Sequence, residues 1–140
     1  MLFRNTFIRL FATLALALSL SGCSEPPYKN LNNDELQSML DQGVPIFDIR
    51  RPDEWRKTGV IEQSQLLTFV DQGGRLKSDF IPRFTRAVDK DQPVILICRT
   101  GNRTDALARH LIEKMGYTQV YNVRNGITRW ISDQRPVKRI

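Results

Sequence analysis

The run of five apolar residues at positions 94–98, VILIC, constrains the fold of this chain more than any other feature. The run follows Pro93, is rich in β-branched residues and gives way to a polar stretch, so it predicts a short strand buried on both faces. Such a strand needs helices on both sides of its sheet. The run therefore favours an α/β fold built on a parallel sheet.

The rest of the chain alternates expected strands and helices, as a parallel sheet requires. With 140 residues there is room for one domain with a single core. Apolar periodicity and capping residues indicate the helices, and continuous apolar runs indicate the strands. The expected helices cover about residues 32–42, 52–57, 78–88 and 102–115, with a short last one around Trp130; the expected strands cover 44–49, 65–70, 94–98 and 120–123.

The first 22 residues have the pattern of a secretory signal peptide. Arg4 and Arg9 lie on the N-terminal side of an apolar run at residues 10–20. This run falls short of the roughly 20 residues that a membrane-spanning helix needs. A basic start, a short apolar segment and small residues after it are typical of an export signal. The alternative, a buried core helix, lacks a polar face for solvent.

Residues 20–23, Leu-Ser-Gly-Cys, resemble the bacterial lipobox. The resemblance implies cleavage before Cys23 and lipid attachment to it, and therefore a location on the periplasmic side of a bacterial membrane. An ordinary signal peptide with a chance cysteine is the alternative. An Asp directly after the lipidated cysteine would resemble an inner-membrane retention signal. This chain has Ser24 there, so the outer membrane is favoured, provided that the source has two membranes. Residues 23–30, with two adjacent prolines, are expected to form a lipidated tether.

Charge and composition exclude several classes of partner. The chain has a formal net charge of +6; without the two arginines of the signal, 19 basic and 15 acidic residues leave a net charge of +4. No long basic run is present, so we expect no nucleic-acid partner, and residues 133–140 are expected to form a short solvated basic tail. No grouping of residues has metal-ligand spacing. We therefore expect no metal and no other cofactor. A monomer is expected.

Cys98 is the candidate nucleophile. It ends the buried strand, where ligands bind in parallel sheets, and a helix is expected four or five residues later. Loop N–H groups, the positive end of that helix and the charges of Arg99 and Arg103 all favour the thiolate over the thiol. If Cys23 carries lipid, Cys98 is the only free thiol of the mature chain. The alternative is a small core residue at a strand end.

Three short segments, in order along the chain, carry a family resemblance: residues 48–55 (DIRRPDEW), 98–103 (CRTGNR) and 121–130 (YNVRNGITRW). They resemble the blocks of rhodanese-type sulfurtransferases, whose active-site loop has four residues between a cysteine and an arginine. The resemblance implies a rhodanese-like domain at residues 31–132. Its fold would be α/β, with a small parallel sheet of about five strands and helices on both faces.

The resemblance also implies a chemistry. Cys98 takes the outer sulfur of a donor such as thiosulfate or a persulfide, holds it as a persulfide, and passes it to a thiol or cyanide. Arg99 is expected to face the donor at the pocket mouth, and Arg103 either to buttress the loop or to screen charge. Asp48 and Arg50 are candidates for the rim, with an ion pair favoured over direct chemistry. The candidate substrate-binding residues are Arg99, Thr100, Gly101, Asn102 and Arg103.

One departure from the family and three rival functions stay open. Residues 59–64 read GVIEQS where the family usually has Gly-His-Ile-x-Gly-Ala, which leaves the geometry of that turn open. A cysteine-loop phosphatase or arsenate reductase is a rival, although such loops place five residues between Cys and Arg to wrap an oxyanion. The other rivals are a non-catalytic, lipid-anchored binding module and a persulfide carrier.

Overall fold

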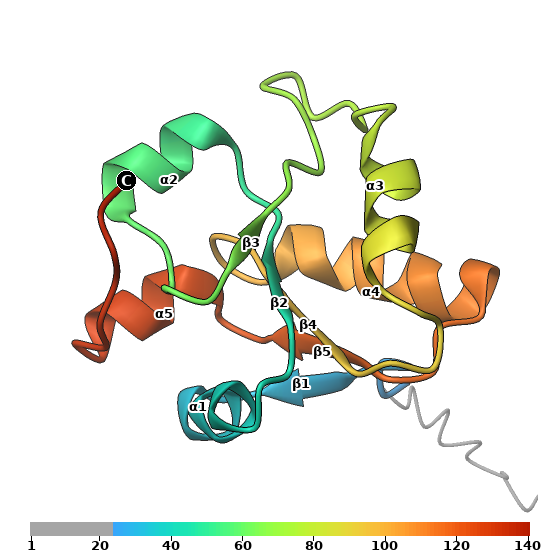
Figure 1. The fold of residues 1–140 in the computed structure, drawn as a ribbon, viewed down its shortest axis with the longest axis horizontal. Helices are drawn as coiled ribbons and strands as arrows, with labels where there is room; N and C mark the ends of the chain where they lie inside the picture. The colour runs from blue at the N-terminus through green and yellow to red at the C-terminus, as the bar shows by residue number, and fades with distance from the viewer. Residues whose placement is uncertain (1–23) are drawn as a thin grey trace, which may run out of the picture.

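The structure is a computed structural model that describes residues 24–140. Its centre is one sheet of five parallel strands in the order β1-β5-β4-β2-β3 (Figure 1). β4 pairs with β2 and β5 on its two sides, and all four of its residues are buried because core clusters cover both faces of the sheet. The expected α/β class and parallel sheet are confirmed. The strands are β1 (Lys29–Leu31), β2 (Ile46–Asp48), β3 (Gln65–Leu66), β4 (Val94–Ile97) and β5 (Val120–Val123).

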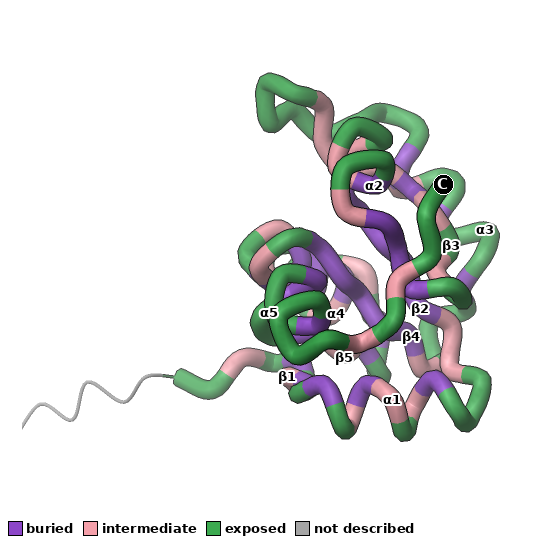
Figure 2. Tube along the Cα trace, turned by 90° about the vertical axis from the view of Figure 1, so that its left-hand side faces the viewer, coloured by how far each residue is buried: buried purple, intermediate pink, exposed green. Residues whose placement is uncertain are grey.

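Five helices surround the sheet: α1 (Asn33–Asp41), α2 (Pro52–Thr58), α3 (Phe80–Ala87), α4 (Asn102–Met115) and α5 (Gly126–Ser132). The side chains of α3 and α4 form one core cluster with one face of the sheet, and those of α1 and α5 form another with the opposite face. In β4, Leu96 faces the first cluster while Ile95 and Ile97 face the second. In Figure 2 the buried residues, in purple, run through the middle of the molecule.

Local sequence signals account for the helix ends. The Asn32 side chain accepts hydrogen bonds from the backbone of Asp34 and Glu35, and the Glu35 carboxylate accepts one from Asn32 N–H, so α1 begins with a capping box. Gly116 ends α4 in the left-handed conformation that glycine adopts without strain. These helices lie within one residue of their predicted bounds.

The segment before β2 contains an edge strand that the sequence pattern does not reveal. Lys29 and Asn30, expected in the tether, form β1 together with Leu31 and pair with β5. Tyr28 is already buried in the core. A three-residue strand that includes a lysine and an asparagine gives no apolar run, and the pairing with β5 makes it a strand. The folded domain therefore begins earlier than residue 31.

The C-terminal residues 133–140 pack on the domain instead of forming a free tail. Val60 and Lys138 exchange two backbone hydrogen bonds of 3.0 and 2.7 Å, and Trp130 Nε1 donates to the carbonyl of Pro136 at 2.8 Å. The C-terminus lies beside α2 (Figure 1). The turn at residues 59–64, where the chain departs from the family pattern, is thereby held at Val60 by the returning C-terminal segment.

Both core clusters, with the hydrophobic residues packed against them, consist of residues between Tyr28 and Val137. The chain from Ser24 onward therefore contains every residue that builds the described core. None of the helices within residues 24–140 is long and apolar enough to cross a membrane. The predicted signal peptide and Cys23 lie outside the described residues.

Candidate active site around Cys98

Cys98 directly follows β4, and the loop that leads into α4 curls around its sulfur. The residue is only 1% exposed. Its Sγ accepts a hydrogen bond from the N–H of Gly101 at 3.2 Å and lies 3.4 Å from the hydroxyl of Thr104. Hydrogen bonds to an ionised acceptor are the stronger ones, so this arrangement stabilises negative charge on the sulfur.

Thr104 is a contact of the sulfur that the sequence reasoning missed. Its side chain is fully buried, and its hydroxyl donates to the carbonyl of Gly101 at 3.0 Å. A hydroxyl can accept from a thiol or turn to donate to a thiolate, so Thr104 can follow either state of Cys98. Residue 104 shares the buried face of α4 with Leu107 and Leu111, at three and seven positions further on. That periodicity was the available signal.

Two glycines allow the loop to pack tightly against the connection between β5 and α5. Gly101 has φ +95°, and a Cβ there would lie 2.1 Å from the carbonyl oxygen of Arg124. Gly126 has φ +58°, and a Cβ there would lie 2.3 Å from the carbonyl oxygen of Arg99. A side chain at either position would collide with backbone, so both positions require glycine.

The start of α5 holds the loop through hydrogen bonds. Ile127 N–H donates to the carbonyl of Cys98 at 2.9 Å, and Thr128 donates to the carbonyl of Arg99 with its N–H at 3.1 Å and its hydroxyl at 2.9 Å. These donors fix the two carbonyl groups on the α5 side of the loop. The third segment of the family resemblance, at residues 121–130, therefore buttresses the loop that carries Cys98.

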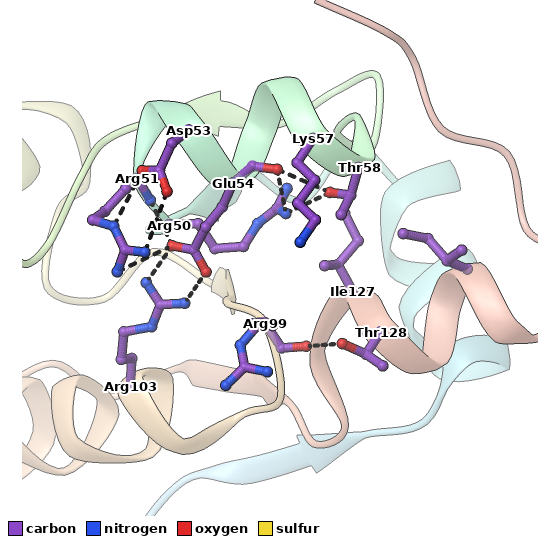
Figure 3. Close-up of a pocket in the computed structure, with 11 residues that line it drawn as sticks. Arg50, Arg51, Asp53, Glu54, Lys57, Thr58, Arg99, Arg103, Ile127 and Thr128 are labelled. Atoms are coloured by element: carbon purple, nitrogen blue, oxygen red, sulfur yellow. Dashed lines mark hydrogen bonds and ion pairs between the residues drawn. The ribbon is translucent and has the colours of Figure 1, made fainter. Parts of the chain in front are cut away.

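Arg103 is bound by Glu54 of α2. The two guanidinium nitrogens donate to the two carboxylate oxygens at 2.8 and 2.6 Å (Figure 3). Burial alone would raise the pKa of Glu54, but the hydrogen bonds from Arg103 and from Arg51 N–H, with the charges of both arginines, outweigh it and lower the pKa to about 2. The pair with Glu54 in turn raises the pKa of Arg103. Arg103 therefore ties α4 to α2, as a buttress would.

Asp48 and Arg50 form a buried ion pair at the end of β2. Their exposed fractions are 0% and 1%, and Arg50 Nη2 lies 2.6 Å from Asp48 Oδ2. The same guanidinium donates to Thr58 Oγ1 at 2.7 Å and to the carbonyl of Gly59 at 2.9 Å. The ion pair favoured from the sequence is present. Arg50 uses its donors to fix the end of α2 and the turn that follows.

A pocket of about 540 Å³ lies over the Cys98 loop, between α2 and the start of α5 (Figure 3). Cys98 does not line this space; Arg99 and Arg103 of the same loop do. Thr100 is half-buried, and Asn102 is exposed as the first residue of α4. The sequence reasoning did not identify several lining residues, because they come from α2 and α5: Lys57, Thr58, Ile127, Thr128 and Ile131.

Within residues 24–140, no group of His, Cys, Asp and Glu side chains could hold a metal ion. Cys98 is the one cysteine of this range. This single thiol accepts a hydrogen bond from Gly101 N–H, in a loop that also carries Arg99 and Arg103.

Comparison with known proteins places the chain in a family. The family model described as a rhodanese-like domain matches residues 32–133. The thiosulfate sulfurtransferase GlpE of Pseudomonas fluorescens is 28% identical over 105 residues, which cover 75% of this chain and 86% of that protein. The crystal structure of a rhodanese-related protein from Thermoplasma volcanium has a TM-score of 0.60 at 25% identity and covers 79% of this chain and 98% of that one.

A thiosulfate sulfurtransferase of Pseudomonas aeruginosa shares the fold, with a TM-score of 0.64 at 22% identity over 80% of this chain and 20% of that one. The matched range contains β2 through α5, the Cys98 loop and the pocket above it. The expected family is confirmed by the family model and by the fold. The chain belongs to the family of rhodanese-like domains.

Proposed function

We propose that this protein is a sulfurtransferase that carries sulfur as a persulfide on Cys98. The observation that carries the proposal is the position of the sulfur, buried after β4 with the Gly101 N–H and the Thr104 hydroxyl directed at it. The relatives named thiosulfate sulfurtransferase support the same chemistry. A thiolate held among donors is a suitable nucleophile for a sulfur–sulfur bond.

The proposed reaction has two steps that balance without an oxidant. The Cys98 thiolate attacks the outer sulfur of thiosulfate, a new S–S bond forms, and sulfite leaves with the electron pair of the old one. An acceptor, cyanide or a thiolate, then attacks the outer sulfur of the persulfide. The S–S bond to Cys98 breaks, and the Cys98 thiolate returns.

The surrounding residues have separate roles in this scheme. Gly101 N–H and the Thr104 hydroxyl stabilise charge on the sulfur, and the Arg99 cation attracts the anionic donor at the pocket. Arg103 holds the loop through Glu54 and is a positioning residue. The same contact argues against a phosphatase, because both terminal nitrogens of Arg103 are engaged by a carboxylate and the loop has only four residues between Cys98 and Arg103.

Steady-state kinetics of the chain from Ser24 onward, with thiosulfate and cyanide, test the proposal. We expect thiocyanate formation by the wild-type protein and none by Cys98→Ser. A protein that forms no thiocyanate but hydrolyses a phosphate ester would be a cysteine-loop phosphatase. A folded protein with neither activity would be a binding module, and the proposal would be wrong.

We also propose that the protein is exported and anchored by lipid on Cys23. The signal-peptide pattern and the lipobox resemblance support this location. β1 runs parallel to the other strands, so the residues that precede it lie at the amino ends of the strands, whereas the Cys98 loop lies at the carboxyl ends. An anchor at Cys23 would then leave the pocket facing away from the membrane. Labelling with a fatty-acid analogue should disappear in Cys23→Ser, and a label that persists would contradict the anchor.

A further inference from the structure

The pocket over the Cys98 loop is larger than an inorganic sulfur donor needs. Its volume of about 540 Å³ lies within the range of roughly 300–1,000 Å³ typical of sites for organic ligands. Thiosulfate has five non-hydrogen atoms and would fill only part of this space. If the protein is a sulfurtransferase, as proposed above, the remaining space is available to the second substrate, the sulfur acceptor.

Two of the positively charged side chains that line the pocket have no acidic partner within residues 24–140. Three arginines of the wall, at positions 50, 51 and 103, form ion pairs with three acids, Asp48, Asp53 and Glu54. Lys57 and Arg99 also line the pocket, and neither makes an ion pair with any residue of the described chain. The net charge that faces a ligand is therefore positive, and it comes from these two side chains.

The two cations approach the pocket from different elements. Lys57 extends from α2 toward the space above the loop, whereas Arg99 extends from the loop itself (Figure 3). Arg99 follows Cys98 directly and suits the small anionic donor. Lys57 lines the pocket from α2 and not from the loop that carries Cys98, so it is available to a charged group at the far end of a longer acceptor.

The wall near α5 supplies an apolar surface. Ile131 is 37% exposed, which is unusual for a large apolar side chain of this domain, and it lines the pocket with Ile127. The two threonine hydroxyls of the wall are already used, because Thr58 donates to the carbonyl of Glu54 and Thr128 to that of Arg99. Recognition here rests on positive charge and apolar contact.

We propose that the sulfur acceptor is an organic thiol of low molecular mass that carries a carboxylate, with Lys57 as a specificity-determining residue that binds this carboxylate. The carbon skeleton lies against Ile131 and Ile127. The acceptor thiolate attacks the outer sulfur of the Cys98 persulfide, the bond to Cys98 breaks, and an organic persulfide leaves with the sulfur. No oxidant is needed, because the sulfur moves between two thiolates.

The test follows the second half-reaction alone. Cys98 is loaded with sulfur from thiosulfate, excess donor is removed, and the second-order rate constant of sulfur loss is measured with mercaptopropionate and with its amide, mercaptopropionamide. The ratio of the two rate constants is compared between wild type, Lys57→Met and Lys90→Met. Comparing ratios cancels the intrinsic reactivity of each thiol. Lys90 serves as the matched control. It is an exposed lysine in the loop before β4, at the end of this strand opposite to Cys98.

We expect the ratio, acid over amide, to fall about fivefold in Lys57→Met, the size of a favourable exposed ion pair, and to stay unchanged in Lys90→Met. An unchanged ratio in Lys57→Met, or an equal fall in both variants, would overturn the inference. Cyanide provides the arm that separates the two proposals. If cyanide removes the sulfur while the ratio is insensitive to Lys57, the sulfurtransferase stands and only the acceptor class is wrong.

Discussion

The two sides of the pocket are built in different ways. The side formed by the Cys98 loop and α5 is held by backbone hydrogen bonds, with glycines at positions 101 and 126 where any side chain would collide. The side formed by the end of β2 and α2 is held by side-chain ion pairs, Asp48–Arg50 and Glu54–Arg103. The backbone side fixes the sulfur, while the ionic side fixes the wall and leaves Lys57 free to face a ligand.

The largest loss of stability is expected from breaking the ionic side at Arg50. In Arg50→Met the fully buried carboxylate of Asp48 loses its partner, and a buried charge left alone costs about 3–5 kcal/mol of unfolding free energy. Urea denaturation measures the loss. Arg75→Met is the control, since its ion pair with Asp71 is exposed and should matter little. A loss below about 1 kcal/mol in Arg50→Met would show that the buried pair does not hold the wall.

Breaking the backbone side at Gly126 should cost somewhat less. Gly126→Ala places a methyl group against the Arg99 carbonyl and adds the strain of positive φ. We expect a loss of about 2–4 kcal/mol of unfolding free energy and a lower rate of thiocyanate formation. Gly43→Ala is the matched control, because φ is +76° with nothing within 4 Å, and only about 1–2 kcal/mol is expected. Equal losses would mean that close packing on the loop is unimportant.

The Glu54–Arg103 bridge, which joins the two sides, makes stability depend on pH. The folded-state pKa of Glu54, about 2, lies below its ordinary value of 4.5. The bridge therefore contributes fully above pH 4.5, and its contribution is lost as the pH falls toward 2. Glu54→Gln should lower the unfolding free energy by about 2 kcal/mol near pH 7, less than the whole shift implies because the pair is partly hydrated.

That difference should shrink as the pH falls from 4.5 to 2, because residue 54 of the wild-type protein is then protonated in the unfolded chain before it is protonated in the folded one, which removes the stability that the ionised carboxylate contributes. Denaturant titrations at several pH values measure it. Glu113→Gln, at an exposed position of α4, should show no such convergence. A constant difference at every pH would indicate that the glutamine perturbs packing and that the charge of Glu54 is not the cause.

The smallest effect is expected at Thr104, where the backbone side meets the sulfur. Thr104→Val keeps the shape of the side chain and removes the hydroxyl that contacts Cys98 Sγ and the Gly101 carbonyl. We expect a loss of about 1 kcal/mol of unfolding free energy and a severalfold slower loading of Cys98 from thiosulfate. Stopped-flow kinetics with denaturation curves separate the two effects. Thr85→Val, on the exposed side of α3, should leave the loading rate unchanged. An unchanged loading rate in Thr104→Val would show that the hydroxyl plays no part in the reaction.

The backbone side was the more predictable one, for a physical reason. A five-residue apolar run, a glycine in the loop and a helix start are local patterns, and they located β4, the Cys98 loop and α4 within a residue. The ionic side depends on pairs such as Glu54 and Arg103, which lie 49 positions apart. No spacing rule reveals them, and the pocket-facing positions of Lys57 and Ile131 follow only from how α2 and α5 pack.

The chain ends were the least predictable part of the fold. β1 is three residues long and partly polar, and its pairing with β5 is what makes it a strand. The C-terminal residues 133–140 carry three basic side chains and are typical of a solvated tail, yet Lys138 pairs with Val60 through backbone groups, which are the same in every non-proline residue. Backbone pairing of this kind leaves no mark on the side-chain pattern.

The most direct test of the central claim is the intact mass of the chain from Ser24 onward, before and after thiosulfate treatment. We predict an increase equal to one sulfur atom, located on Cys98 by peptide mapping, removed by cyanide with release of thiocyanate, and absent in Cys98→Ser. An unchanged mass of the folded wild-type protein, or a sulfur atom that is still gained by Cys98→Ser, would contradict the account.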